Sequence, residues 1–267
     1  MIKTVGYQPL IPISICVTDI CQLKCEYCFQ TSHTLSFLSK EKLDIILNQL
    51  RHIVHDIQIT LMGGEPSLYP YLNYMLDELN KIKAVKEILF FTNGLKTLSK
   101  THFNKKLHIT FSYHVTQNNK GAIIKNLDFL KTNNIPIKYD INAMMVPGKH
   151  LEIEEFKKYC AVKPLYIETK HEVCFYNSCP ELYDLKDIDY DGNLISVKEF
   201  LSKPRNFKGK KCFSAEYDIE LNLLISNKCI GDSIPIDQFA NFINKHSYII
   251  CPFEKCIVQA CGGLFIE

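Results

Sequence analysis

The sequence predicts an α/β fold, an open partial barrel of six strand–helix units with a small cysteine-rich module near the C-terminus. Three observations lead to this prediction. Over about the first 170 residues, short apolar β-branched runs alternate with segments whose apolar residues recur at helical spacing. Such alternation is typical of a parallel sheet with right-handed crossovers. After about residue 170 the alternation weakens, and a second module with several cysteines begins near Lys210.

The individual elements follow from local patterns. Strands are expected at residues 11–18, 56–62, 87–92, 107–114, 135–145 and 164–168. Helices are expected at 40–52 with Ser39 as N-cap, around 72–79, at 121–133 and at 151–160. Later in the chain we expect a turn at 190–193, two short strands around a bend at Asn222, and a helix around 236–244. The predicted domains are residues 1–205 for the barrel and 206–267 for the module.

Composition narrows the class of protein. A chain of 267 residues with 46% hydrophobic and 22% charged residues can bury a sizeable core. The net charge of +2 argues against binding driven by a strong basic field, so no nucleic-acid partner is expected. No stretch reaches the length of a membrane span, and twelve cysteines without a secretory segment are expected to be metal ligands or reactive thiols in the cytoplasm.

The first chemical motif follows the first strand. Cys21, Cys25 and Cys28 lie within eight residues, and a tight loop of this kind can point three thiolates at one cubic iron–sulfur cluster. Three thiolates leave one iron open for another ligand, much as catalytic zinc sites keep an open position. A zinc loop and part of a ferredoxin-type site are the alternatives.

The second motif is Gly63-Gly64-Glu65-Pro66, at the end of the second strand. Glycines let a backbone approach a ligand closely because no Cβ is in the way. In isolation, such a tetrapeptide is more often a turn than a site.

Together, the C-x3-C-x2-C spacing, Tyr27 before the third cysteine and the Gly-Gly-Glu-Pro sequence one strand later resemble the radical S-adenosylmethionine (SAM) superfamily. The resemblance implies a partial (β/α)6 radical SAM barrel and a [4Fe-4S] cluster on the three cysteines, with the amino and carboxylate groups of SAM on the open iron. It assigns Gly63, Gly64 and Glu65 to the methionine ammonium group. Tyr27, Phe29 and Pro66 are expected beside the cofactors.

Other candidates end later strands, where sites form in such sheets. Asn93 is either a cap on the cavity floor or a turn residue. Ser112 and His114 share one face of their strand. Ser112 is expected to contact SAM, and His114 either contacts substrate or makes a structural hydrogen bond. Asn142 binds ribose or simply caps its strand.

The late cysteines form a third signal. Their spacing resembles the Twitch or abbreviated SPASM extension, in which a hairpin pair and a later pair bind an auxiliary [4Fe-4S] cluster. It is similar to short radical SAM dehydrogenases, such as the one acting on 2-deoxy-scyllo-inosamine, and to peptide-modifying members. The late spacing is wider than the usual C-x2-C, and a structural zinc site or unligated thiols are the alternatives. The expected ligands are Cys212, Cys229, Cys251 and Cys256, with Cys261 as a substitute.

These features imply an oxidoreductase or modifying enzyme that reductively cleaves SAM to a 5′-deoxyadenosyl radical. The radical would abstract a hydrogen from a small molecule or ribosomal peptide, with the auxiliary cluster as electron acceptor and a flavodoxin- or ferredoxin-type electron donor. No peptide-leader-binding domain is recognised before the barrel, which favours a small molecule or a separately supplied recognition protein. The alternatives are a redox-neutral peptide epimerase with Cys174 or Cys179 as hydrogen donor, and a non-enzymatic zinc-binding module.

Overall fold

The structure is a computed structural model. It describes residues 10–28, 35–145, 153–169, 172–174, 186–190, 193–196, 211–212, 217–227, 233–246, 249–250 and 265–266.

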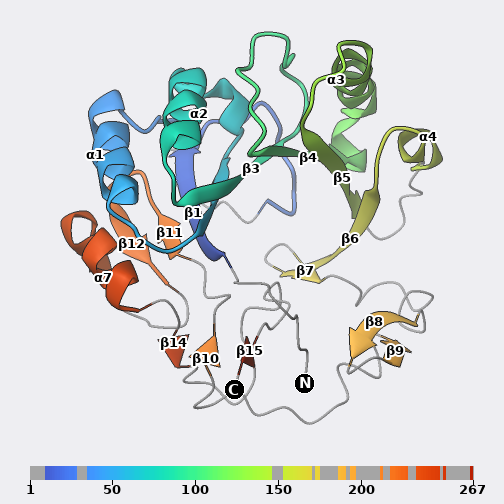
Figure 1. The fold of residues 1–267 in the computed structure, drawn as a ribbon. Coiled ribbons are helices and arrows are strands. Elements are labelled where there is room, and N and C mark those ends of the chain that lie inside the picture. Colours follow the sequence, from blue (N-terminus) through green and yellow to red (C-terminus); the bar gives the residue numbers. More distant parts are fainter. Residues whose placement is uncertain are drawn as a thin grey trace.

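Six parallel strands in sequence order form the centre of a ten-stranded sheet. These strands are β1 (Ile11–Thr18), β2 (Ile57–Gly63), β3 (Val85–Thr92), β4 (Leu107–His114), β5 (Lys138–Met145) and β6 (Val162–Thr169). The helices between them are α1 (Lys40–Arg51), α2 (Leu72–Lys81), α3 (Lys120–Thr132) and α4 (Glu154–Lys157). Figure 1 shows these helices along the outer side of the curved sheet. The predicted partial barrel is therefore confirmed.

Most predicted boundaries lie within two residues of the observed ones. The exceptions are the helix predicted at 151–160, of which α4 spans only Glu154–Lys157, and the start of β5. β5 begins three residues later than expected because the preceding residues close the end of α3. Asn134 adopts a left-handed conformation there (φ 48°), and the amide of Ile135 donates to the carbonyl of Leu130 (3.0 Å). Apolar residues that close a helix C-terminus can therefore resemble the start of a strand in the sequence.

The two strands predicted around Asn222 form, and they belong to the main sheet. β11 (Tyr217–Ile219) lies parallel to β1, with Ile219 opposite Ile15, and β12 (Leu224–Ser226) and β13 (Ile234–Pro235) extend the sheet as antiparallel strands. A 3-10 turn, η3 (Ile236–Gln238), then leads into α7 (Phe239–Lys245). Buried side chains of this segment, including Phe239, pack in the same core as the barrel. The boundary at residue 205 remains a prediction.

The other described strands are short. β7 (Glu172–Cys174) pairs antiparallel with β6 at the far edge of the main sheet. β8 (Lys186–Tyr190) and β9 (Asn193–Ser196) pair antiparallel, and the middle of the turn predicted at 190–193 lies outside the described residues. β10 (Lys211–Cys212) lies between β14 (Ile249–Ile250) and β15 (Phe265–Ile266). Within the part of the chain that the structure describes, no helix is both long and apolar enough to cross a bilayer.

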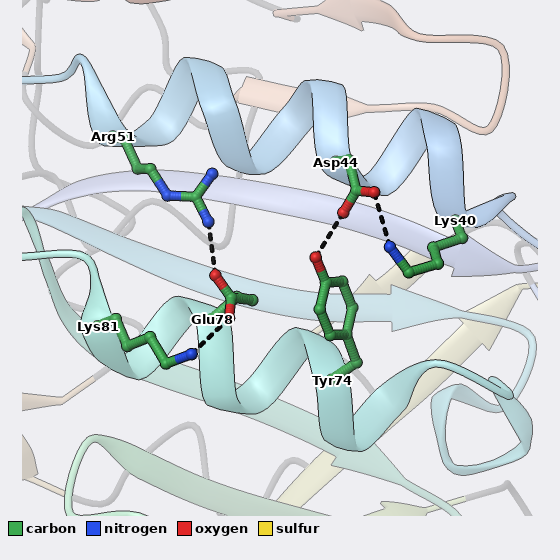
Figure 2. Close-up of polar contacts among 6 residues, drawn as sticks. All are labelled: Lys40, Asp44, Arg51, Tyr74, Glu78 and Lys81. Atoms are coloured by element: carbon green, nitrogen blue, oxygen red, sulfur yellow. Dashed lines mark hydrogen bonds and ion pairs between the residues drawn. The ribbon is translucent and has the colours of Figure 1, made fainter.

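Side chains of α1 and α2 are joined by polar contacts over the outer face of the sheet (Figure 2). The Tyr74 hydroxyl donates to Asp44 (2.7 Å), which also pairs with Lys40. Arg51 and Lys81 both bind the carboxylate of Glu78 at 2.6 Å. The two contacts that cross between the helices, Tyr74 to Asp44 and Arg51 to Glu78, align them. Ion pairs this exposed are screened by solvent and add little to the stability of the fold.

The inner face of the sheet is polar near its amino-terminal edge. On β4, alternate residues from Leu107 to Tyr113 are buried in the core, which leaves His108, Thr110, Ser112 and His114 on the opposite, inward face. His108 lies between Glu87 (3.6 Å) and Asp140 (3.3 Å), and Gln58 donates to Glu87 (2.6 Å). The carboxylates of Asp140 and Glu87 raise the pKa of His108 to about 9.

This network predicts a pH-dependent stability. Because the pKa of His108 is higher in the folded chain than its ordinary value of 6.5, its stabilising effect is complete below about pH 6.5 and is lost as the pH rises through about 9. Urea unfolding at a series of pH values should show the free energy of unfolding declining less steeply in His108→Gln than in the wild type. If the free energies of unfolding of the wild type and His108→Gln fell in parallel with rising pH, Glu87 and Asp140 would not be stabilising a charged His108.

Candidate cofactor site

The cysteine loop leaves the carboxyl end of β1, where Cys21, Cys25 and Cys28 are all partly buried. Within it, the amide of Cys28 donates to the carbonyl of Cys25 (3.1 Å), and the amide of Leu23 donates to the Sγ of Cys21 (3.4 Å). The loop is therefore a compact turn that presents its thiols toward neighbouring strand ends.

Gly63 and Gly64 hold the chain that enters this loop. The Gly64 amide donates to the carbonyl of Thr18, and the Glu65 amide donates to the carbonyl of Ile20, both at 2.7 Å. A Cβ on Gly63 would lie 2.0 Å from the Thr18 carbonyl oxygen, and one on Gly64 would lie 2.3 Å from that of Ile20. Gly63 also has a φ of +134°, which side chains rarely adopt. We call this contact the glycine clamp. Both positions need glycine because the backbone here lies against the backbone of residues 18–20. The sequence alone had suggested a close approach to a ligand.

Glu65 is buried, with 2% of its surface exposed. Its carboxylate accepts hydrogen bonds from the Thr92 hydroxyl (2.6 Å), the Asn93 amide (2.7 Å) and the Ser67 amide (3.0 Å). Desolvation by burial raises its pKa, and these three donors oppose that rise. In the structure Glu65 joins the ends of β2 and β3, and a contact with the methionine group of SAM remains a prediction.

His114 connects the cysteine loop to the end of β4. Its Nδ1 lies 2.9 Å from the Tyr27 hydroxyl and 3.6 Å from the Cys25 Sγ, and the Tyr27 and His114 rings are stacked. Burial lowers the pKa of His114 to about 4, so the imidazole is neutral near pH 7. Gln117, in the 3-10 turn η2 (Val115–Gln117), faces the backbone amide and carbonyl of Lys24 at 3.4 Å. Loop and strand end are thus held together.

Asn119 is a residue of this site that sequence reasoning missed. It is fully buried, and its side-chain amide donates to the carbonyls of Asn93 (2.6 Å) and Ser112 (2.8 Å). Its carbonyl oxygen accepts from the amide of His114 (2.9 Å). One side chain thereby fixes the ends of β3 and β4. The only sequence signal was an Asn-Asn pair before a helix, which reads as an ordinary turn.

The remaining predicted residues differ in how far the structure describes them. Asn93 lies against the loop, with its Nδ2 3.3 Å from the Gln22 side chain and 3.9 Å from the Cys21 Sγ. Pro66 is buried and begins the 3-10 turn η1 (Pro66–Leu68) after the glycine clamp. Ser112 and Asn142 are register partners on β4 and β5, and both are partly buried.

Cys174 and Cys212 are described by their strands alone, β7 and β10. Outside the described residues lie Phe29, Cys179, Cys229, Cys251, Cys256 and Cys261.

The thiols fit an iron–sulfur cluster better than a single metal ion. Burial raises the pKa of Cys25 to about 11, with further contributions from Cys21 and Cys28, so the three sulfurs are close enough to repel one another as thiolates. Among the residues the structure describes, no three Cys, His, Asp or Glu side chains converge tightly enough to chelate one ion. A cubic cluster needs no such convergence, because each thiolate binds a different iron. It also neutralises charges that are costly in a half-buried loop.

Comparison with known proteins agrees with this geometry. The family model of the Radical SAM superfamily matches residues 15–161. GTP 3′,8-cyclase of Psychromonas ingrahamii is 29% identical over 276 aligned residues, which cover 96% of this chain and 74% of that protein. GTP 3′,8-cyclase of Aquifex aeolicus is 24% identical over 186 residues, which cover 60% of this chain and only 57% of that protein.

Among solved structures, SuiB of Streptococcus suis bound to the precursor peptide SuiA superposes with a TM-score of 0.56 at 16% identity. The superposition covers 86% of this chain and 64% of SuiB, and at this identity it concerns the fold alone. The family match is stronger, because it spans more than half of the chain and includes both the cysteine loop and Gly63–Pro66. The chain therefore belongs to the radical SAM superfamily, whose enzymes use a [4Fe-4S] cluster and S-adenosylmethionine.

Proposed function

We propose that this enzyme abstracts a hydrogen atom from a small-molecule substrate inside the open barrel, and that the net reaction is an oxidation. The observation that carries the proposal is the position of the three thiols. They lie at the carboxyl ends of parallel strands. The loop contacts the end of β4 through His114, and the inward side chains of β4 are all polar: His108, Thr110, Ser112 and His114. A polar interior beside a radical-generating site suits a substrate that needs orientation by hydrogen bonds.

The proposed roles follow from the contacts of each residue. Cys21, Cys25 and Cys28 hold the cluster, which with bound SAM supplies the 5′-deoxyadenosyl radical. Neutral His114 orients the loop through the Tyr27 hydroxyl, since a neutral imidazole can hold that contact without adding a charge beside the thiols. Ser112 and Asn142, adjacent on neighbouring strands, are the polar groups proposed to meet SAM or its ribose.

A small molecule is favoured over a peptide by the relatives. Both cyclases named above have a nucleotide, GTP, in their names. A second candidate is therefore ring closure of a purine nucleoside triphosphate, in place of a simple oxidation. Peptide epimerisation with Cys174 or Cys179 as donor is ranked below both, because the peptide-bound SuiB resembles this chain at 16% identity, in fold alone.

An auxiliary [4Fe-4S] cluster, accepting the electron that an oxidation releases, is part of the proposal. Its support is the pairing of β10 with β14. β10 ends at Cys212, whose register partner is Ile249, and β14 ends one residue before Cys251 in the chain. The strand that pairs with β10 is thus followed directly in the sequence by a second expected ligand, Cys251. A flavodoxin- or ferredoxin-type protein is the proposed electron donor.

Reductive cleavage of SAM tests the radical chemistry. Anaerobically reconstituted protein with dithionite and SAM should form 5′-deoxyadenosine, measured by mass spectrometry. Cys25→Ala should reduce formation to the level without protein, while Cys160→Ala, whose half-buried thiol lies outside the site, should not. Adding GTP separates the candidate substrates, because only a cyclase would consume GTP in step with 5′-deoxyadenosine. Colourless, zinc-loaded protein that leaves SAM intact would overturn the proposal.

The iron content tests the auxiliary cluster separately. Two [4Fe-4S] clusters give about eight irons per chain, and Cys212→Ala should lower the count to about four without abolishing SAM cleavage. A wild-type count of about four would remove the second cluster and, with it, the proposed electron acceptor.

A further inference from the structure

A cavity of about 280 Å³ opens at the amino-terminal ends of β3, β4 and β5. Four lysines line it, Lys86, Lys105, Lys106 and Lys138, together with Glu87 and His108. We call it the lysine pocket. His108 and His114 are six residues apart on β4, so the pocket lies roughly 20 Å from the cysteine loop. It is therefore distinct from the site described above.

The lysines in this pocket are incompletely paired. Lys86 lies 3.2 Å from Asp56, and the Nζ of Lys106 donates to the carbonyls of Asn80 (2.7 Å) and Ile82 (2.9 Å). For Lys105 and Lys138, the described residues provide neither a hydrogen bond nor an ion pair. Neither ammonium group is thus held by a hydrogen bond within the described residues, although Lys138 lies close enough to Glu87 to interact with it electrostatically.

The carboxylates nearby are already engaged. Glu87 and Asp140 flank the imidazolium of His108, so three charges of that network sum to a single negative charge. With Asp56, two negative charges then oppose the four lysines, which leaves a net charge of about +2 around the cavity. Burial lowers the pKa of Lys106, and the positive charges of Lys86 and Lys105 lower it further. Like charges are therefore held close together, which costs free energy unless an anion binds.

The geometry points to a binding site for a phosphate-type oxyanion in the lysine pocket. Lysine ammonium groups bind phosphate as point charges with three donors each, and a pocket near the lower end of small-ligand volumes suits a phosphate or pyrophosphate group. That group belongs either to the distal end of a compound bound inside the barrel or to a separate phosphate-bearing ligand. The first is geometrically open because His108, which lines the pocket, lies on the inward face of the sheet with its register partner Lys138. The inference does not depend on the radical chemistry.

The abundance of lysine in this chain offers a simpler explanation, since only Arg51 and Arg205 are arginines among 31 basic side chains. Scattered surface lysines would not converge on one cavity, and the charges of Lys86 and Lys105 would not lower the pKa of Lys106. Anion binding to the lysine pocket separates the two explanations directly.

Pyrophosphate titrated calorimetrically into the anaerobic full-length protein should bind at one site. Lys138→Gln should weaken binding about tenfold and the double variant Lys105→Gln/Lys138→Gln further, because each removes a charge-assisted contact. Lys138→Arg should retain most of the affinity. Lys125→Gln, an exposed lysine of α3, is the matched control and should bind as the wild type does.

A measurement on the wild type alone guards against variants that fail to fold. Bound pyrophosphate should protect Lys105 and Lys138, but not Lys125, from acetylation read by mass spectrometry. Competition between GTP and pyrophosphate would identify the pocket as the seat of a nucleotide phosphate, and saturation by pyrophosphate without competition would identify a separate ligand. No binding at millimolar pyrophosphate, or equal binding by the double variant, would overturn the inference.

Discussion

Two backbone hydrogen bonds in the glycine clamp are the contact on which the rest of the site depends. They join the end of β2 to the chain between β1 and Cys21, and both are 2.7 Å long. Such close approach is feasible only without side chains, as the 2.0 Å and 2.3 Å contacts of a Cβ on Gly63 and Gly64 indicate. Because the clamp fixes residues 18–20, it sets where the cysteine loop starts. Cys21 then meets Asn93 after the end of β3, and Cys25 meets His114 at the end of β4.

Beyond the glycine clamp, hydrogen bonds of buried polar side chains connect the ends of β2, β3 and β4. Glu65 connects β2 to β3 through Thr92 and Asn93, and Asn119 connects β3 to β4 through Asn93, Ser112 and His114. His114 then returns to the loop through Tyr27. Each buried acceptor and donor in this chain of contacts is paired, which is the condition for polar groups to lie in a core without a large cost. The chain's own side chains thus join the strand ends that surround the cysteine loop.

The sequence predicted those parts of this structure that depend on local patterns. β1 and β4 have the predicted bounds, because alternating or continuous apolar runs specify buried strands, and Ser39 caps α1 as expected. The spacing of Cys21, Cys25 and Cys28 likewise indicated the radical SAM superfamily. Contacts between segments that are distant in the sequence left no local pattern from which they could be predicted. The place of β11 beside β1, the burial of Glu65 and the role of Asn119 follow from tertiary packing, and the lysine pocket gathers residues from three strands.

The account's central claim is that the glycine clamp positions a cluster-binding loop, and iron loading of Gly64→Ala tests it most directly. Its matched control is Gly121→Ala, since a Cβ at Gly121 meets nothing within 4 Å. After anaerobic reconstitution, with the far-ultraviolet circular dichroism spectrum unchanged, Gly64→Ala should lose the iron bound by Cys21, Cys25 and Cys28 and its SAM cleavage, and Gly121→Ala should keep both. A Gly64→Ala variant that loads iron and cleaves SAM like the wild type would contradict the account.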